Sequence, residues 1–520
     1  MHVNRHPSGS ALPQAGRRLK WALWGIAALL PALLFAAHPL LTLFEENETE
    51  LPLAVIWQPL GITLAVTVAL YGVLVLVTRS WTKAGALTAL VVVWFFYWDT
   101  FKHDLSGLHL SGGLTLALWL VLCATAAVAI ALARRGLGTV MLGAGVAAVV
   151  LTLSPALKVA SYQHRHPAVR ASDPRLWATD PLPAPRTAVK RPDIYVIVPD
   201  DYARADVLRR YFHYDNSAFE AQLRRRGFTI SEDARSPYSD SESNIAAELN
   251  MGYLEGLGRV LGKKSQDVRP LKTLMESSRA SRLAKSLGYR HVHLDSDEVT
   301  FAAGNPDISS VATPDSFPSL WLRKSVLREI GGRFGFDDGA QDERFRRNYR
   351  SSFSRLDSVP GQRSPKLVVF HTLLPHDPYI FGARGQAVTF PSTSDEVIHS
   401  RLGMRYYLPQ LRYLEGKLLH TVDTIRRHSK DAVIVLQADE GFESGDKTFD
   451  EPTVLDIRVK GLLAFSLPGV SGVRPPRPPN TVNTLRYVFN KLFGTHYRML
   501  PSTSAPDGDY PYQWERLRVR

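Results

Sequence analysis

Acidic and imidazole side chains follow three hydrophobic runs of the sequence, DIYVIV, KLVVF and AVIVL. They are Asp200 and Asp201 after the first run, His371 and His376 after the second, and Asp439 and Glu440 after the third. Carboxylates gathered at one place repel one another unless a cation lies between them. The pattern therefore predicts a site for one divalent ion. Carboxylate oxygens favour Mn²⁺, Mg²⁺ or Ca²⁺, and the imidazoles leave Zn²⁺ as an alternative.

Several serines precede a helical stretch in the segment Ser236–Asn250, SPYSDSESNIAAELN. A hydroxyl at a helix N-terminus lies where negative charge is stabilised and where its pKa can fall, especially beside a metal ion. One serine is thus a candidate nucleophile, although an ordinary helix cap explains the pattern too. Spacing alone leaves Ser239, Ser241 and Ser243 as candidates.

The three runs are predicted to be buried strands, with His291–Leu294 and Leu462–Leu467 as weaker strand candidates. Helical patterns lie between them, at Ser217–Arg226, Leu271–Ser286, Tyr406–Arg427 and Thr481–Leu492. Strands alternating with helices predict an α/β domain with a largely parallel central sheet. Functional groups in such sheets collect beyond the carboxyl ends of the strands. A helix cap or a solvated loop explains any single aspartate here, but it explains three strand ends poorly.

The charged residues divide the chain into two parts with different surroundings. Residues 1–158 contain 16 charged side chains, against 95 in the remaining 362. Five apolar stretches fill the first part, namely Trp21–Phe44, Leu60–Val77, Ala84–Tyr97, Gly112–Ala133 and Leu137–Leu157. About 20 apolar residues cross the hydrocarbon core of a membrane, so the short third stretch must extend through Trp98 toward Phe101. We expect an α-helical membrane domain of five spans.

The loops between these stretches predict an orientation. Lysine and arginine precede the first stretch and separate the second from the third and the fourth from the fifth, whereas the other loops are acidic or mixed. Because basic loops stay in the cytoplasm, we expect the N-terminus inside and everything after the fifth span outside. The expected domains are residues 1–157 in the membrane, 158–190 as a proline-rich linker, 191–500 as an extracytoplasmic domain and 501–520 as a C-terminal tail.

The cysteine count and the net charge exclude several functions. The one cysteine, Cys123, lies in an apolar stretch and cannot form an intrachain disulfide or a cysteine-based zinc or iron–sulfur site. The net charge of +13 is spread without a basic block, so no nucleic-acid partner is expected. The spans hold few ionisable residues, which argues against a transporter.

Eight segments between residues 190 and 500 follow one another as they do in a known family. They are DIYVIVPDDYARADVL, YDNSAFEAQLRRRGF, AAELNMGYL, LLPHDPY, QLRYLEGKLL, VIVLQADEG, LPG and VNTLRYVFNKLFG. The order resembles the sulfatase-like branch of the alkaline phosphatase superfamily, in particular membrane proteins of the lipoteichoic acid synthase and phosphoethanolamine transferase type. The resemblance implies an alkaline-phosphatase-like α/β fold and a metal-bound hydroxyl nucleophile at a helix N-terminus.

The resemblance also implies roles for single residues. The implied catalytic residues are Ser241 and His376, the implied metal ligands are Asp200, Ser241, Asp439 and Glu440, and Asp201, Arg204 and His371 are candidates for contacts with substrate. Glu440 stands where the family has a histidine, which favours a harder metal ion. Ser241 stands where this branch usually has a threonine, so the hydroxyl is kept.

The implied function is transfer or hydrolysis of phosphate esters of the cell envelope through a phospho-substituted serine. Its implied place is the bacterial cytoplasmic (inner) membrane, with membrane lipids and anionic envelope lipids or glycans as partners. Common sulfatases convert the first residue of a C/S-x-P-x-R motif to formylglycine, and no such motif surrounds Ser241. This favours phosphate over sulfate esters. The alternatives are a sulfatase or phosphodiesterase that transfers to water, and a metal-free domain for binding or assembly.

Overall fold

The computed structural model describes most of the chain and divides it into two compact units. The described residues are 14–183, 190–295, 307–311, 321, 325–327, 329, 338–392, 394–445, 449–505, 510–514 and 517–518. The helical unit comprises Met1–Pro167 and Ser316–Gly335, and the sheet unit comprises Ala168–Asp315 and Phe336–Arg520. The chain therefore passes between the two units three times.

Four described helices of the helical unit are long and apolar enough to cross a membrane. They are α1 (Gln14–Glu46), α2 (Trp57–Thr78), α5 (Gly112–Leu132) and α6 (Leu137–Arg165). Two further helices, α3 (Trp81–Phe96) and α4 (Trp98–Asp104), meet at a bend of 63° and make a fifth span if they cross together. The third apolar stretch thus continues past Trp98 as expected, but as a bent pair of helices. The expected apolar helical region is confirmed, with four spans or five.

Part of the segment Ser316–Gly335 packs on the helical unit. The ring of Trp321 lies 5.0 Å from the ring of Phe96. Val326 is fully buried in an apolar cluster that includes Trp98. This segment follows strand β4 (Ile308–Val311) of the sheet unit in the sequence. The helical unit is therefore built from two separate pieces of the chain.

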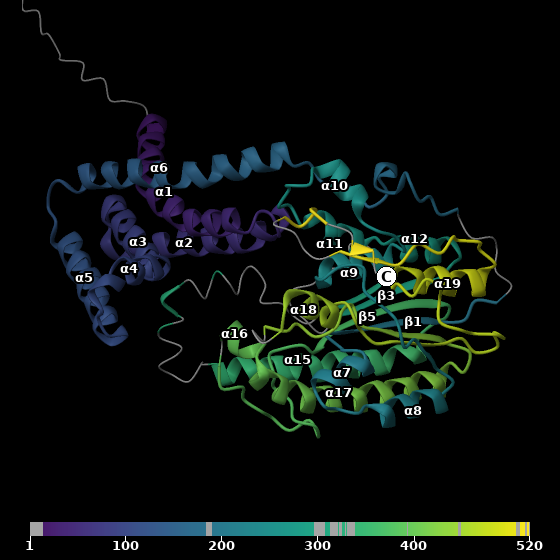
Figure 1. Cartoon of the computed structure of the whole chain (residues 1–520). Coiled ribbons are helices and arrows are strands. Elements are labelled where there is room, and N and C mark those ends of the chain that lie inside the picture. The colour runs from purple at the N-terminus through teal and green to yellow at the C-terminus, as the bar shows by residue number, and fades with distance from the viewer. Residues whose placement is uncertain are drawn as a thin grey trace, which may run out of the picture. The chain divides into compact units, whose positions relative to one another are not determined.

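The sheet unit is built around seven strands in the order β2-β7-β6-β1-β5-β3-β4 (Figure 1). The strands are β1 (Ile194–Asp200), β2 (Thr229–Ile230), β3 (Arg290–Asp295), β4 (Ile308–Val311), β5 (Lys366–Pro375), β6 (Val433–Gln437) and β7 (Leu463–Ser466). The five strands from β6 to β4 run parallel, whereas β7 and β2 are antiparallel to their neighbours. The predicted largely parallel sheet is confirmed, with one reversed strand, β7.

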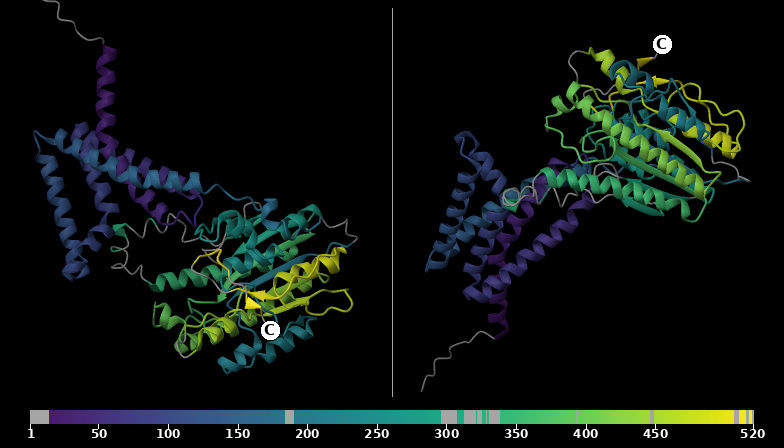
Figure 2. Two further views of the ribbon diagram at one scale, coloured as in Figure 1. Left: turned by 45° about the horizontal axis from the view of Figure 1, so that its top comes forward. Right: turned by 90° about the horizontal axis from the view of Figure 1, so that it is seen from below.

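Helices cover both faces of this sheet (Figures 1 and 2). On one face lie α9 (Ser241–Leu249), α11 (Arg269–Glu276), α12 (Arg279–Ser286) and α19 (Val482–Phe493), and on the other lie α7 (Ala205–Tyr211), α8 (Ser217–Arg225), α15 (Asp338–Ser358) and α17 (Arg401–His428). Successive strand residues point to opposite faces. Val196 therefore belongs to the apolar cluster on one face of the sheet, the first cluster, and Ile197 to the apolar cluster on the other face, the second cluster. Both faces are buried, which is why the strands read as unbroken hydrophobic runs.

One predicted helix, Leu271–Ser286, is in fact two. Helix α11 ends at Glu276, and Ser278 begins α12 by accepting a hydrogen bond from the backbone N–H of Ser281 at 3.2 Å. Serine competes for backbone hydrogen bonds and favours caps over helix interiors. Hydrophobic periodicity alone does not predict such a break. The other three predicted helices agree with α8, α17 and α19 to within a few residues.

Residues expected to be a linker and a tail take part in the two units. Helix α6 continues through the first residues of the expected linker to Arg165. After residue 500, β8 (Thr503–Ser504) pairs with β9 (Leu517–Arg518), and Tyr512 is buried in the first apolar cluster. The hydroxyl of Tyr512 donates to the carbonyl of Asp267.

A buried ion pair lies at the end of the sheet where β1, β5 and β6 begin. Lys366 Nζ is 2.6 Å from Asp193 Oδ2, and the two side chains are 0% and 1% exposed. Asp193 Oδ1 also accepts from the backbone N–H of Lys366 at 3.1 Å, and its carbonyl accepts from Val433 N at 2.8 Å. One aspartate thus connects the first residues of three neighbouring strands.

Candidate functional site

Five of the predicted residues meet at the carboxyl edge of the sheet. Asp200 ends β1 and Asp201 follows it, His371 lies in β5, and Asp439 and Glu440 follow β6. Ligand atoms of Asp200, His371 and Asp439 lie within 4.8 Å of one another, as do those of Asp200, Asp201 and Glu440. All five residues are buried. The edge therefore carries two overlapping groups of potential metal ligands that share Asp200.

The turn after β1 directs Asp201 into this site. Asp201 has a φ of 58°, in the left-handed region that few residues other than glycine adopt. Tyr407 on α17 stabilises the turn, because its hydroxyl donates to the Asp201 carbonyl at 2.8 Å and accepts from the N–H of Ala203 at 3.1 Å. A helix from a distant part of the sequence thus holds a backbone conformation that local preferences disfavour.

Ser241 is the serine whose hydroxyl faces the acidic group. It is the first residue of α9, and its Oγ donates to Glu440 Oε1 at 2.8 Å. Asp240 caps the helix by accepting from the backbone N–H of Ser243 at 2.7 Å. Ser239 precedes the cap, and Ser243 lies buried inside the helix. The geometry therefore distinguishes three serines that spacing left equivalent.

His376 lies beside the same acidic residues, just beyond β5. Its Nε2 is 4.0 Å from Asp201 Oδ2, and its Nδ1 is 3.2 Å from Asp377 Oδ1. Burial opposes protonation of His376, but the charges of Asp201, Asp200 and Asp377 outweigh it and raise its pKa to about 10. A protonated imidazole at this position can donate hydrogen bonds to an anionic substrate.

Burial and mutual repulsion hold the carboxyl groups in different protonation states. Burial opposes ionisation of Asp200, but the imidazole of His371, 3.7 Å away, and the positive charges of His376 and Arg458 outweigh it, so its pKa lies below the usual value. Burial and the charge of Asp200 raise the pKa of Asp439 to about 8. Burial also raises the pKa of Glu440 well above the usual value, although Arg458 opposes this. A bound cation would favour the ionised forms of all three.

Two carboxylate oxygens of the site fit such a cation. Among the described residues, Asp200 Oδ1 and Asp439 Oδ2 are buried and have no hydrogen-bond partner. An unpaired polar atom in the interior is costly, and a divalent ion between these oxygens would remove the cost. With His371 the donor set is two carboxylates and an imidazole, and with Glu440 it is carboxylates alone. The first set suits Zn²⁺ or Mn²⁺ and the second Mg²⁺, Mn²⁺ or Ca²⁺.

Sequence reasoning missed Arg458, the residue with the most ionic contacts in the site. It ends α18 (Glu451–Arg458), and its guanidinium lies 2.8 Å from Glu440 Oε1, 2.9 Å from Asp201 Oδ1 and 3.3 Å from Glu443 Oε2. A basic residue in the last turn of a helix is ordinary, because it complements the helix dipole. Nothing in the local sequence therefore distinguished it.

Two further residues contact the surroundings of the site histidines: Asp295 lies beside His371, and His399 lies beside Asp377, the neighbour of His376. Asp295 Oδ1 lies 3.4 Å from His371 Nδ1, and His399 Nε2 lies 3.6 Å from Asp377 Oδ1. Asp295 could have been predicted as a site residue, because it directly follows the weaker strand candidate His291–Leu294. His399 had no comparable signal, since it stands just before α17 and away from any strand end.

Arg204 is the predicted site residue that lies apart from the others. Its guanidinium is 2.6 Å from Asp206 Oδ1 and donates to the Ala234 carbonyl at 2.6 Å. These contacts hold the start of α7 and involve none of the acidic site residues. The other predicted residues lie at one edge of the sheet.

Comparison with known proteins finds similarity at the level of structure only. No family model and no curated sequence matches the chain. An alkaline phosphatase superfamily protein from Vibrio parahaemolyticus is 14% identical, with 65% of this chain and 78% of that one covered and a TM-score of 0.41. The C-terminal periplasmic domain of the Escherichia coli protein EptC, in complex with Zn, is 11% identical (61% and 87% covered, TM-score 0.36). A 2-O GAG sulfatase is 12% identical (62% and 79% covered, TM-score 0.39).

These neighbours thus include a sulfatase and a protein of the alkaline phosphatase superfamily. Identities of 11–14% and TM-scores near 0.4 are too low to transfer a reaction or a substrate. The chemistry of this chain has to come from its own side chains, chiefly Ser241 and the acidic residues around it.

Proposed function

We propose that the sheet unit is a metal-dependent hydrolase or transferase that acts on phosphate esters through a covalent serine intermediate. One observation carries the proposal: the Ser241 hydroxyl, at a helix N-terminus, donates to Glu440 at 2.8 Å beside two overlapping groups of metal ligands. A hydroxyl in such a place is positioned for nucleophilic attack.

The proposed reaction begins when the Ser241 oxygen attacks a phosphorus atom. The bond to the leaving alcohol breaks as the new P–O bond forms, and the departing alkoxide takes a proton from solvent. The Ser241 proton passes to Glu440 Oε1, which already accepts its hydrogen bond. Protonated His376 donates to a non-bridging oxygen. A divalent ion held by Asp200 and Asp439 would lower the pKa of the hydroxyl and offset the charge on the phosphoryl oxygens.

The second half of the reaction releases the group. An acceptor hydroxyl or a water molecule attacks the phosphoserine, the bond to Ser241 Oγ breaks, and Glu440 returns its proton to that oxygen. The proton of the acceptor goes to solvent. Transfer and hydrolysis differ only in the acceptor, and both agree with this arrangement of side chains.

The apolar helices support a substrate in the envelope of a bacterial cell. A unit joined to four or five spans stays beside lipid, so lipid head groups and anionic envelope glycans are the proposed substrates. The distribution of basic loops supports an N-terminus in the cytoplasm and a catalytic unit outside the inner membrane.

Mass spectrometry of the full chain tests the proposal. After exposure to envelope lipids in detergent, we expect an adduct on Ser241, and its mass identifies the donor class. Ser241→Ala should lose the adduct, whereas Ser243→Ala should keep it, because Ser243 does not face Glu440. Undiminished turnover by Ser241→Ala would contradict the nucleophile assignment.

One observation favours a second candidate, a metal-free domain for binding or assembly. The Arg458 guanidinium already pairs with both Asp201 and Glu440 and reduces the repulsion between them. Metal analysis of the purified chain separates the candidates, since the enzyme should retain about one divalent ion per chain after dialysis.

A further inference from the structure

Arg458 makes its contacts from a fixed position. A Cβ at Gly441 would collide with the carbonyl of Ile457, so the chain after Glu440 lies directly against the end of α18. The N–H of Gly441 donates to the Arg458 carbonyl at 2.6 Å, and Arg458 Nε donates to the Ser239 carbonyl at 2.9 Å. Hydrogen bonds thus hold both the backbone and the side chain of Arg458, and they place its guanidinium beside the acidic residues.

The guanidinium engages only one of the two overlapping groups of metal ligands. It contacts Asp201 Oδ1 and Glu440 Oε1, which belong to the group completed by Asp200. Among the described residues, the carboxylate oxygens of the site without a hydrogen-bond partner are Asp200 Oδ1, which both groups share, and Asp439 Oδ2, which belongs to the group with His371. A metal ion bound to Asp201 and Glu440 would lie close to a like charge and would lose attraction to both oxygens.

We propose that Arg458 competes with the divalent ion for Asp201 and Glu440, and that it thereby lowers metal affinity and directs the ion toward His371. The proposal rests on the proposed function, because it concerns the same metal site. Arg458 is a positioning residue in this scheme. An anionic substrate that draws the guanidinium away frees two carboxylates, so metal and substrate strengthen each other's binding.

Titration calorimetry of the EDTA-treated full chain with MnCl₂ tests this proposal. Arg458→Gln should bind Mn²⁺ at least about tenfold more tightly, because a cation beside the ion is removed. Arg458→Lys keeps the charge on a shorter, single donor and should lie between the two. Lys460→Gln is the matched control: it removes the same charge two residues away, where the side chain pairs with Asp456 and Asp206.

Each outcome of this experiment is decisive. Equal or weaker Mn²⁺ binding by a folded Arg458→Gln, with binding by the wild type intact, overturns the competition alone. Equal gains in Arg458→Gln and Lys460→Gln also overturn it, because the effect would then be one of net charge. No binding of Mn²⁺, or of Zn²⁺ in a parallel titration with ZnCl₂, by any of the four chains overturns the metal dependence in the proposed function itself.

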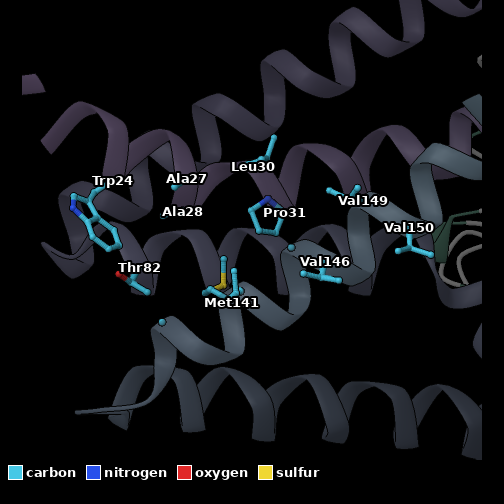
Figure 3. A pocket seen from close by; sticks show the side chains of 13 residues that line it. Trp24, Ala27, Ala28, Leu30, Pro31, Thr82, Met141, Val146, Val149 and Val150 are labelled. Atoms are coloured by element: carbon cyan, nitrogen blue, oxygen red, sulfur yellow. The ribbon is translucent and has the colours of Figure 1, made fainter. Parts of the chain in front are cut away.

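An independent observation concerns an apolar cavity of about 460 Å³ in the helical unit (Figure 3). Its lining comes from α1, α3 and α6 and comprises Trp24, Ala27, Ala28, Leu30, Pro31, Thr82, Gly138, Met141, Leu142, Gly145, Val146, Val149 and Val150. Small residues make the space: Gly138 and Gly145 lie seven positions apart on one face of α6, across from Ala27 and Ala28. Such walls offer water no hydrogen-bond partners.

The cavity has one polar end. Trp24 and Thr82 are the lining residues with a polar side-chain atom, and Figure 3 shows both toward one end and Val150 toward the other. The rest of the lining is apolar, and its helices α1 and α6 are long and apolar enough to cross a membrane. Such a cavity matches the hydrocarbon chain of a lipid.

We infer that this cavity holds an acyl chain of a membrane phospholipid. Native mass spectrometry of the full chain, purified in detergent with phosphatidylglycerol, tests the inference. Gly145→Leu fills the cavity and should reduce retained lipid several-fold, whereas Gly143→Leu on the same helix should not. A Cβ at Gly145 meets only Pro31 Cγ, at 3.5 Å, and one at Gly143 meets nothing within 4 Å, so neither change strains the helix.

Equal retention of lipid by Gly145→Leu and Gly143→Leu overturns the inference.

Discussion

The Ser241 hydroxyl donates a 2.8 Å hydrogen bond to Oε1 of Glu440, a residue 199 positions later in the sequence. The donor begins helix α9 and the acceptor follows strand β6, so the pair exists only once the sheet has formed. The same oxygen of Glu440 is also 2.8 Å from Arg458. A carboxylate oxygen shared between a hydroxyl and a guanidinium links Ser241, the proposed nucleophile, to the charge balance of the whole site.

Two replacements of Ser241 should show whether its hydroxyl oxygen is required for turnover. We expect Ser241→Ala to lower the turnover of phosphodiester substrates by about 10³-fold or more, as removal of a nucleophile does in comparable enzymes. Ser241→Thr keeps the hydroxyl and should retain activity within about tenfold of the wild type. Steady-state kinetics of the full chain in detergent measure both, and a Thr variant as inactive as the Ala variant would contradict the assignment.

Metal addition should stabilise the fold. A ligand that binds only the folded chain at 100 times its Kd adds about 2.7 kcal/mol to the free energy of unfolding. We therefore expect MnCl₂ to raise the midpoint of thermal unfolding of the EDTA-treated chain. Asp439→Asn should remove most of this shift, because it deletes one of the buried carboxylates, whereas the exposed Asp215→Asn should keep it. A wild-type chain without any shift would speak against a metal site.

Stability should fall between about pH 4.5 and 7 because of Glu415. Burial raises its pKa from 4.5 to about 7, although hydroxyls of Tyr202 and Tyr214 donate to it. A folded pKa above the unfolded one means that the stabilising contribution is complete below pH 4.5 and lost as the pH rises through 7. The loss is about 3 kcal/mol.

Calorimetry of wild type and Glu415→Gln at pH 5 and pH 8 measures this contribution. The variant should lose less stability between the two pH values, because its amide does not ionise. The exposed Glu232→Gln should behave as the wild type. An identical pH dependence of all three chains would show that Glu415 does not carry the effect.

The pair Lys366–Asp193 should be costly to break. Lys366→Met leaves a buried carboxylate without its counter-ion, and we expect a loss of about 3–5 kcal/mol in the free energy of unfolding. The double variant Lys366→Met, Asp193→Asn leaves no buried charge and should recover part of that loss. Thermal unfolding measures both, and a single variant as stable as the wild type would contradict the account.

The strands and most site residues could be predicted because their signals are local. Runs such as DIYVIV are unbroken only when both faces of a strand are covered, and a parallel sheet brings strand ends such as Asp200 and Asp439 to one edge. Arg458 could not be predicted this way. Its role depends on how α18 packs against the chain after Glu440, and no local sequence pattern predicts that packing. The break in the predicted helix Leu271–Ser286 escaped because hydrophobic periodicity ignores a capping serine.

The three passages of the chain between its units change what a single proteolytic cut can do. A cut in the proline-rich stretch after residue 167 would leave the sheet unit attached through Ser316–Gly335, which belongs to the helical unit. That attachment is non-covalent and includes the packing of Trp321 and Val326 on the helical unit. Release of the sheet unit therefore requires loss of this packing or further cleavage. The sheet unit expressed alone from residue 191 would carry Trp321 and Val326 without the surface that covers them.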